Sequence, residues 1–342
     1  MKVVFVSQLP LSLAYGGVEV QVLRTADALR SVGVDVELLD PWKMSFDGDL
    51  LHCFTSEYQI AEVVAHAKGL GIPVVTSAVF SPRRSIAAYR AWRLVDRLVP
   101  LKTSFGLRGA VLRESSAVIA LTRREAAVLV SLFRVPEAKV HVIGNGVDAG
   151  FFTATPGEFV ARFGLVDCIL CVAWLGRRKN QHRLLEAVGE MGPPVVLIGP
   201  TYGKEPGYAQ EIAARVACMG PAVRWLGSLP QDSSLLVSAF AAAKVFVLPS
   251  LAEIQPLSVL QAAAAGANIV VSDLPHLRET FGDYVWYCDP TSVSSIRRAV
   301  GDAYQAPRGV RYTSAPPWLL SWRDVAVQVR RVYEAVLTAR SR

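Results

Sequence analysis

The chain alternates short apolar runs with amphipathic stretches over almost its whole length. In the first half the apolar runs lie at residues 2–6, 34–40, 49–54, 72–78, 117–122 and 139–144. Amphipathic patterns at 20–33 and 60–71 separate several of these runs and predict helices. Short, continuously apolar strands joined by helices are typical of a parallel sheet that is covered on both faces.

The second half repeats this pattern. Its apolar runs lie at residues 168–174, 194–199, 222–227, 245–250 and 268–273, with a shorter run at 285–289. The helices between them are expected to begin near Gln181, Gly207, Leu235, Pro256 and Leu277. The sequence therefore predicts an α/β protein with two doubly wound Rossmann-like domains that face a central cleft, where the carboxyl ends of the strands bind ligands.

The length of 342 residues also favours two domains. Residues 145–159 are polar and contain Gly and Pro, and we interpret them as a hinge. We place the N-terminal domain at 1–148 and the C-terminal domain at 149–318. Residues 319–342 contain a strongly amphipathic helix at 321–337.

Composition excludes several classes of protein. Hydrophobic residues make up 52% and charged residues 19% of the chain, which excludes general disorder. No apolar run approaches the ~18 residues that span a bilayer, and the N-terminus does not match a signal peptide, so we expect a cytoplasmic protein. The pair Cys168 and Cys171 invites a zinc or redox interpretation, but its apolar surroundings favour buried thiols.

Basic residues are concentrated between positions 83 and 124. Ten Lys and Arg lie there against two acidic residues, with Tyr89, Trp92 and Phe105 among them. Such a segment suits an anionic membrane surface or an acidic substrate, and a solvated arginine-rich helix face explains it equally well. No nucleic-acid recognition motif accompanies the charge, so we expect no nucleic-acid partner.

Residues 249–266 carry the most informative polar pattern. Glu253 precedes Gln261 by eight residues, and an apolar helix start lies between them. The amides of Gln255, Leu257 and Ser258 would point outward with partial positive charge, which favours an anion. A ligand with hydroxyls and phosphates fits this pattern, and an ordinary strand–loop–helix unit with a capping glutamate is the alternative.

Three other loops that follow strands carry residues suited to a diphosphate. Gly16 and Gly17 precede a helix and allow close approach of a phosphate to the backbone, although a simple turn also explains them. Arg177, Arg178 and Lys179 follow a strand and could neutralise a diphosphate or form a solvated turn. The loop at 198–203 contains Gly199, where a base or ribose could approach the backbone. The dinucleotide motif GxGxxG is absent.

Taken together, these segments resemble the retaining nucleotide-sugar glycosyltransferases of the GT-B fold, family four (group 1). The resemblance rests on GGVEVQVLRTADAL, VIGNGVD, RRKNQHRLLEA, VLIGP, VRWLGSLP, FVLPSLAEIQPLSVLQAAAAG and the closing SW…VY helix. It implies a hexosyltransferase with an acceptor-side first domain, a donor-binding second domain, and a last helix that packs back on the first.

The resemblance also implies roles for single residues. Lys179 would neutralise the leaving diphosphate and Glu253 would contact the donor sugar, which makes these two the expected catalytic residues. Further donor contacts are expected from Gly16, Gly17, Arg177, Arg178, Gly199, Gln255, Pro256, Leu257, Ser258 and Gln261.

The chain departs from the family pattern at several positions. An expected arginine is Trp174, the second motif glutamate is Gln261, and Ser77 and Ala78 lie where many members have a histidine. Gln261 retains ribose hydrogen bonding but loses a charge-assisted bond of roughly 1–2 kcal/mol. For His52 we expect a packed or surface role.

The resemblance implies a nucleotide-diphosphate sugar as donor, with no cofactor and no metal required, and transfer with retention. We expect the acceptor to be a glycan or a lipid-linked molecule. The enzyme is expected in the cytoplasm, with a peripheral position on the inner face of the membrane if the basic segment binds lipid. A degenerate, non-catalytic glycosyltransferase-like subunit and a nucleotide-sugar epimerase or hydrolase of the same fold remain alternatives.

Overall fold

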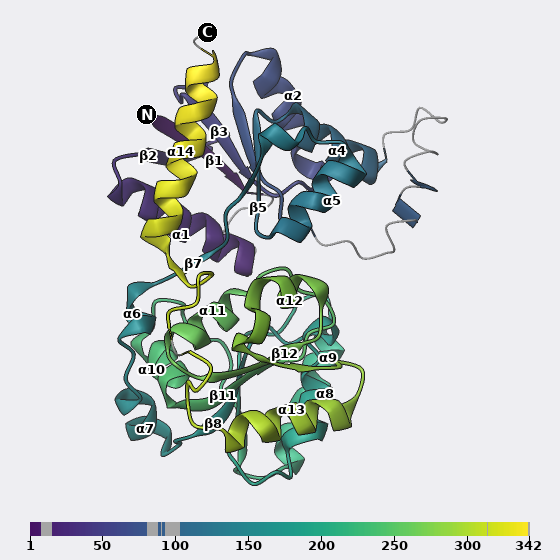
Figure 1. Ribbon diagram of the computed structural model, residues 1–342, viewed down its shortest axis with the longest axis vertical. Coiled ribbons are helices and arrows are strands. Elements are labelled where there is room, and N and C mark those ends of the chain that lie inside the picture. Colours follow the sequence, from purple (N-terminus) through teal and green to yellow (C-terminus); the bar gives the residue numbers. More distant parts are fainter. Residues whose placement is uncertain (8–15, 81–87, 90, 93–102, 313, 341–342) are drawn as a thin grey trace. The chain divides into compact units, whose positions relative to one another are not determined.

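The protein divides into two compact units in the computed structural model, which describes residues 1–7, 16–80, 88–89, 91–92, 103–312 and 314–340. Unit 1 comprises residues 1–146 together with 322–342, and unit 2 comprises residues 147–321. Each unit contains a sheet with helices packed around it (Figure 1).

The sheet of unit 1 is parallel and has the strand order β2-β1-β3-β4-β5-β6. Its strands are β1 (Lys2–Ser7), β2 (Asp35–Leu38), β3 (Leu50–Phe54), β4 (Val74–Ser77), β5 (Ala117–Ala120) and β6 (Val140–Val142). Every residue of β3, β4 and β5 is buried. Because both faces of these strands are covered, their residues are buried without the alternation of a half-exposed strand.

Helices from both ends of the chain cover this sheet. They are α1 (Gly17–Ser31), η1 (Tyr58–Ile60), α2 (Ala61–Gly69), α4 (Ser104–Glu114), α5 (Arg123–Phe133), η2 (Glu137–Lys139) and α14 (Trp322–Arg340). The closing helix α14 lies alongside α1 (Figure 1), and Arg330 Nη1 donates to the carbonyl of Val32 over 2.7 Å. The predicted packing of the last helix on the first domain is therefore found.

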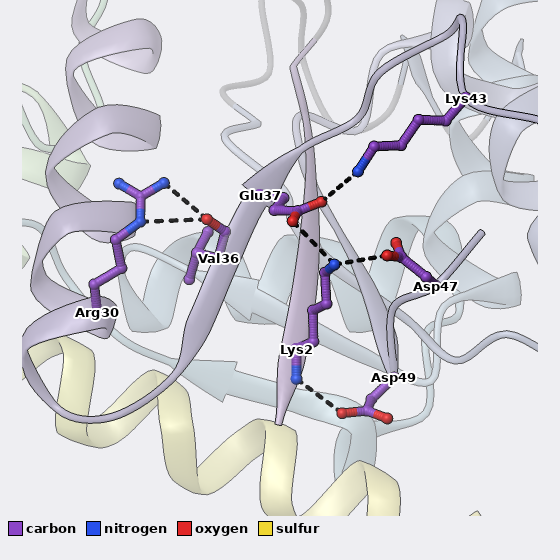
Figure 2. Close-up of polar contacts among 7 residues, drawn as sticks. All are labelled: Lys2, Arg30, Val36, Glu37, Lys43, Asp47 and Asp49. Atoms are coloured by element: carbon purple, nitrogen blue, oxygen red, sulfur yellow. Dashed lines mark hydrogen bonds and ion pairs between the residues drawn. The ribbon is translucent and has the colours of Figure 1, made fainter. Parts of the chain in front are cut away.

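An exposed ion-pair network fastens the segment between β2 and β3 to the start of β1. Lys2 Nζ lies 2.7 Å from Asp47 and 2.9 Å from Glu37, whose other oxygen accepts from Lys43 over 2.8 Å (Figure 2). The backbone amide of Lys2 also donates to Asp49. Exposed pairs of this kind add little stability, so the network mainly fixes the course of the segment.

The sheet of unit 2 is also parallel, with the order β10-β9-β8-β11-β12-β13. Its strands are β8 (Cys168–Val172), β9 (Val195–Ile198), β10 (Val223–Trp225), β11 (Ala243–Leu248), β12 (Asn268–Ser272) and β13 (Trp286–Cys288). The strand order reverses between β8 and β11, which is the arrangement of the doubly wound dinucleotide-binding fold. The prediction of two parallel sheets is confirmed.

The helices of unit 2 enclose a single apolar core. They are α6 (Ala149–Phe152), α7 (Gly157–Phe163), η3 (Arg177–Lys179), α8 (Gln181–Val188), α9 (Pro206–Cys218), α10 (Ser234–Ala242), α11 (Leu257–Ala264), α12 (Pro275–Phe281), η4 (Gly282–Tyr284) and α13 (Val293–Gln305). Two short strands, β7 (Gly146–Val147) and β14 (Leu320–Ser321), pair with each other.

The segment predicted as a hinge has a defined structure. The boundary between the units falls at Gly146 and Val147, and residues 149–152 already form α6. Phe151 and Phe159 are both buried in the core of unit 2. The Gly and Pro residues around them suggested a loop, but the two aromatic side chains anchor the segment by packing.

Candidate functional site

The carboxyl ends of β8 and β11 are the natural place for a ligand in unit 2. These two strands are neighbours, and the strand order reverses between them. The turn after β8 carries Lys179, and the loop after β11 carries Glu253. In open α/β sheets a crevice opens at such a reversal, because the connections leave in opposite directions.

Lys179 and Glu253 form a buried ion pair at this reversal. Lys179 Nζ donates to Glu253 Oε1 over 2.6 Å, and each residue is only 8% exposed. Two buried charges are tolerated because each one compensates the other. The sequence predicted both residues as catalytic, and the structure brings them together across 74 positions of chain.

The turn that carries Lys179 is held rigidly. Asn180 adopts the left-handed conformation with φ 65°, which asparagine tolerates better than most residues. Its side-chain amide donates to the carbonyls of Pro249, over 2.9 Å, and Pro290, over 2.7 Å. The Leu251 amide donates to the Arg178 carbonyl over 2.8 Å. These bonds join the β8 turn to the β11 loop, so Lys179 and Glu253 are positioned by the backbone as well as by each other.

The two predicted arginines of this turn have different surroundings. Arg178 Nη1 donates to the Ala252 carbonyl over 2.8 Å and lies 3.6 Å from Glu253 Oε1. Arg177 instead faces α9, where its guanidinium lies 3.4 Å from Glu211. Only Arg178 therefore joins the cluster that contains Lys179 and Glu253.

The start of α11 lies just beyond Glu253. Pro256 is its N-cap residue, and no side chain among the described residues caps this end. Gln255 and Pro256 are buried, whereas Leu257 and Ser258 are partly exposed. The first amides of an α-helix have no acceptor within the helix, and they carry partial positive charge. This end of α11 can therefore attract an anion.

Gln261 is buried within α11 and contacts a residue that the sequence did not indicate. Its Nε2 donates to Gln231 Oε1 over 3.3 Å. Gln231 follows β10, so it also comes from the carboxyl end of the sheet. Gln231 lies in no recognisable motif, and only its position after a strand of a doubly wound sheet could have marked it.

The packing of unit 2 requires a glycine at position 199. Its φ is 149°, and a Cβ there would lie 2.0 Å from the carbonyl oxygen of Ala173. The ends of β8 and β9 approach each other too closely for a side chain. Packing alone explains this glycine, and its predicted donor contact stays a prediction.

The glycine pair of unit 1 stands at the start of α1. Gly16 is the N-cap with φ −159°, an extended conformation open to any residue. A Cβ on Gly17 would meet nothing within 4 Å in the described residues. A Cβ on Gly16 would meet the end of the Glu19 side chain at 3.1 Å, so among the described residues only a flexible side chain opposes a larger residue there. The predicted contact of both glycines with a donor diphosphate stays a prediction.

A second polar cluster lies inside unit 1. His52 is fully buried and bonds to Tyr333 Oη over 2.5 Å and to Ser77 Oγ over 3.0 Å. Burial lowers the pKa of His52 to about 3, so the imidazole is neutral at physiological pH. Since Tyr333 belongs to α14, the cluster connects this helix to β3 and β4. The packed role expected for His52 is confirmed.

Glu125 is a buried carboxyl in the same unit. Its two oxygens accept from the amides of Phe80, over 2.5 Å, and Leu121, over 2.7 Å. Burial raises its pKa to about 7, against the opposing effect of these two hydrogen bonds. Glu125 therefore ties the segment after β4 to the start of α5.

Cys168 and Cys171 are both buried in β8, as predicted. Burial raises the pKa of each thiol to about 12. Within the described ranges, no three His, Cys, Asp or Glu side chains lie close enough to hold a metal ion. The expectation that no metal or cofactor takes part stays untested.

The basic segment at 83–124 lies partly outside the described residues, since Arg83, Arg84, Arg90, Arg93, Arg97 and Lys102 fall in the gaps. Arg108 pairs with Glu57 and covers the Phe80 ring. Tyr89 and Phe105 stack on each other with ring centroids 5.5 Å apart, so they serve internal packing. Trp92 is 45% exposed. Of the three expected aromatic anchors, two pack within unit 1.

No helix in the described parts of the chain is long and apolar enough to cross a membrane.

Two family models match the chain. Residues 167–305 match a model described as glycosyl transferases group 1, and residues 41–151 match glycosyltransferase family 4.

A D-inositol 3-phosphate glycosyltransferase of Stackebrandtia nassauensis is 32% identical over 191 residues, which is 51% of this chain and 42% of that protein. The O-antigen chain mannosyltransferase B of Escherichia coli is 25% identical over 209 residues, 58% of this chain and 50% of that protein. The chain thus spans about half the length of the curated relatives it matches.

Solved structures share the fold over the whole chain. A sucrose-phosphate synthase from Thermosynechococcus elongatus has a TM-score of 0.77 at 17% identity and covers 99% of both chains. Anabaena HepE in complex with UDP and glucose has a TM-score of 0.74 at 14% identity, over 98% of this chain and 99% of that chain. These likenesses confirm the predicted fold class, with two Rossmann-like sheets.

Proposed function

Since the chain belongs to the group 1 glycosyltransferases of family 4, we propose that it transfers a hexose from a nucleoside-diphosphate sugar to an acceptor hydroxyl. The single observation that carries the proposal is the Lys179–Glu253 pair at the strand reversal of unit 2. It sets a cation beside a carboxylate, and α11 begins at Leu257, shortly after Glu253. A sugar diphosphate needs partners of these kinds.

Lys179 and the start of α11 would bind the leaving diphosphate. Negative charge builds up on the diphosphate as the bond to the sugar breaks, and fixed positive groups stabilise that charge most when they need no reorganisation. The backbone bonds of Asn180 hold Lys179 in place before the donor arrives. An ammonium group has three donors, so Lys179 can keep its bond to Glu253 and still bind a phosphate oxygen.

Glu253 would accept hydrogen bonds from hydroxyls of the donor sugar. Its place beside Lys179 sets the sugar next to the diphosphate that leaves. We propose that the acceptor hydroxyl attacks the face from which the diphosphate departs, so that the anomeric configuration is retained. This proposal agrees with the resemblance to retaining enzymes, and the sequence contains no evident nucleophile for double displacement.

Gln261 would hold the ribose of the nucleoside. Its Nε2 is engaged by Gln231, which leaves Oε1 as the natural acceptor for a ribose hydroxyl. The neutral amide forms weaker bonds than a carboxylate, so we expect modest donor affinity.

The acceptor is a glycan or a lipid-linked molecule. The proposal of a lipid-linked acceptor in a membrane depends on the basic residues between positions 83 and 124. Co-sedimentation with anionic liposomes at low and high salt tests it. Sedimentation of the protein with the liposomes at low salt but not at high salt supports a membrane-bound acceptor. If the protein sediments with no anionic lipid, this part of the proposal is wrong.

The test of the function is a donor screen by calorimetry. The wild-type protein is titrated with UDP, GDP and ADP and with the corresponding sugar nucleotides, and donor turnover is then followed with candidate acceptors. Binding of one nucleoside diphosphate, with release of that diphosphate only when acceptor is present, supports a transferase. If no nucleotide binds, the proposal is wrong.

A non-catalytic binding subunit is the second candidate, because Trp174 and Gln261 stand where the family pattern has charged residues. That candidate predicts donor binding without turnover in the presence of any acceptor. Release of free sugar without acceptor would instead indicate a hydrolase, and a change of configuration in the recovered sugar nucleotide would indicate an epimerase.

A further inference from the structure

A cavity of about 510 Å³ lies in unit 1, at the amino ends of β4 and β5. It is lined by the ends of α2 and α4, by β6 and by the last turns of α14. None of the residues proposed for the donor site is among the described residues that line it. Small-molecule sites in proteins have volumes of about 300–1,000 Å³, so this cavity can hold a ligand of its own.

The apolar stripe of α14 extends beyond the core that it covers. Val325, Val329 and Val332 are buried on this stripe. At the helical spacing, the stripe continues with Val336 and Ala339, and both of these residues line the cavity. Val336 is partly buried and Ala339 is exposed. The cavity thus lies where the rest of the helix has an apolar partner.

The opposite wall of the cavity is apolar as well. Ile72 and Pro73 lead into β4, and Ala117 is the first residue of β5. Proline has no amide to donate, and the Pro73 carbonyl already accepts from the amide of Leu51 over 2.9 Å. Water at such a wall gains few hydrogen bonds, so an apolar group that displaces it gains affinity.

The charged side chains of the cavity carry a net positive charge. Lys68 of α2 and Glu114 of α4 form an ion pair, so their charges cancel. Arg340 in the last turn of α14 adds one positive charge. The carbonyl of Ser115 at the end of α4 is compensated separately, since it accepts from Lys139 Nζ over 3.0 Å. A ligand with one negative charge therefore suits this cavity.

His141 of β6 is the titratable group among these charges. It lines the cavity together with Lys68, Glu114 and Arg340. Burial lowers the pKa of His141 below its ordinary value of 6.5, so the imidazole is mainly neutral at pH 8. An anion beside the imidazole would favour the protonated form and raise this pKa. Binding of an anion is thereby linked to the uptake of a proton.

We propose that this cavity binds an apolar monocarboxylate. Its hydrocarbon part lies between α14 and the residues that lead into β4, and its carboxylate lies toward Arg340 and His141. A guanidinium binds a carboxylate through paired hydrogen bonds, and an imidazolium adds a further charge-assisted bond. Because the cavity is separate from the donor residues, its occupancy is independent of the proposed transferase activity.

The test uses octanoate as the probe. Calorimetry at pH 6 and pH 8 measures its binding to the wild-type protein, with octanol as a probe without charge and acetate as a probe without a chain. Proton NMR of the histidine rings reports the pKa of His141 with and without octanoate, and His141→Gln assigns the signal. His66→Gln is the matched control, because His66 is exposed on α2 and is not among the described residues that line the cavity.

We expect octanoate to bind at least about tenfold more tightly than acetate or octanol. Binding should tighten about threefold to tenfold from pH 8 to pH 6, and octanoate should raise the pKa of His141. His141→Gln should remove this pH dependence, whereas His66→Gln should retain it. Arg340→Gln should weaken octanoate binding about threefold to tenfold at both pH values.

A second pair of variants tests the place of the hydrocarbon chain. Ala339→Trp adds an indole that fills the cavity and should abolish octanoate binding. Thr338→Trp adds the same indole at an exposed neighbouring position that is not among the described cavity residues, and it should leave binding unchanged. Both substitutions replace exposed residues, so both variants should fold, which circular dichroism melting checks.

Three results would overturn the proposal. The first is the absence of saturable octanoate binding to the wild-type protein at concentrations up to about 10 mM. The second is equal binding of octanoate by Ala339→Trp and the wild-type protein, because the ligand would then lie elsewhere. The third is an unchanged pKa of His141 in the presence of saturating octanoate.

Discussion

The two units contain buried polar clusters of opposite character. In unit 1, His52, Ser77 and Tyr333 are neutral and buried, and His52 bonds to both of the other side chains. In unit 2, Lys179 and Glu253 are charged, and the exposed Arg178 lies beside them. A neutral, saturated cluster connects parts of the fold, whereas charged groups at the carboxyl edge of a sheet keep capacity for a ligand. On the proposed function, similar folds thus use buried polar groups for architecture in one unit and for binding in the other.

The sharpest test of this contrast is the removal of Lys179. Lys179→Met leaves Glu253 buried with Arg178 as its remaining cation, so the free energy of unfolding should fall by about 3–5 kcal/mol. Nucleoside diphosphate binding should be lost as well. Urea unfolding and calorimetry measure the two effects.

The double variant Lys179→Met/Glu253→Gln separates stability from binding. Without the uncompensated carboxylate it should regain most of the lost stability, yet it should still fail to bind the diphosphate. Recovery of binding in the double variant would show that Lys179 has a structural role only, like the buried polar cluster around His52 in unit 1.

A second test uses the pH dependence of Glu125. The pKa of Glu125 is about 7 in the folded chain and about 4.5 in an unfolded chain. Between pH 4.5 and pH 7, its carboxyl group is therefore protonated in the folded state and ionised in the unfolded state. Its contribution to stability is complete below pH 4.5 and declines by about 3 kcal/mol as the pH rises to 7.

Urea unfolding of the wild-type protein and Glu125→Gln at pH 5 and pH 7.5 checks this prediction. Other titrating groups cancel in the difference between the two proteins. The wild-type protein should lose more stability than the variant over this interval. Identical pH slopes would mean that Glu125 is not buried as a carboxyl in solution.

The third test concerns Gln261. Gln261→Glu should tighten nucleoside diphosphate binding about tenfold, since a carboxylate forms stronger bonds to ribose hydroxyls. Gln231 can reorient its amide to donate to the new carboxylate, so no clash is introduced. The 2′,3′-dideoxy nucleotide is the control and should show no gain. An equal gain with that analogue would exclude the ribose contact.

The smallest effect is expected in unit 1. Tyr333→Phe removes the hydroxyl that bonds to His52, which should lower the free energy of unfolding by about 1 kcal/mol. Donor affinity should not change. A loss of donor affinity in a stably folded variant would contradict the division between architecture and binding.

The sequence predicted the strands of the two sheets well because buried parallel strands are mostly apolar, and each of the expected runs overlaps a strand. It indicated Lys179 and Glu253 separately, but their ion pair depends on strand order, which one sequence does not reveal. The polar pattern at 145–159 predicted a hinge and did not indicate that two of its phenylalanines are buried in the core of unit 2. Gln231 and the Trp174–Arg178 contact were missed because each depends on side-chain placement between separate loops.

The most direct test of the proposed donor site is a crystal structure with the tightest-binding nucleoside diphosphate. The account predicts diphosphate oxygens within about 2.7–3.2 Å of Lys179 Nζ and of the first amides of α11, with the ribose at Gln261. A diphosphate bound away from the β8 and β11 ends, with the Lys179–Glu253 pair untouched, would contradict it.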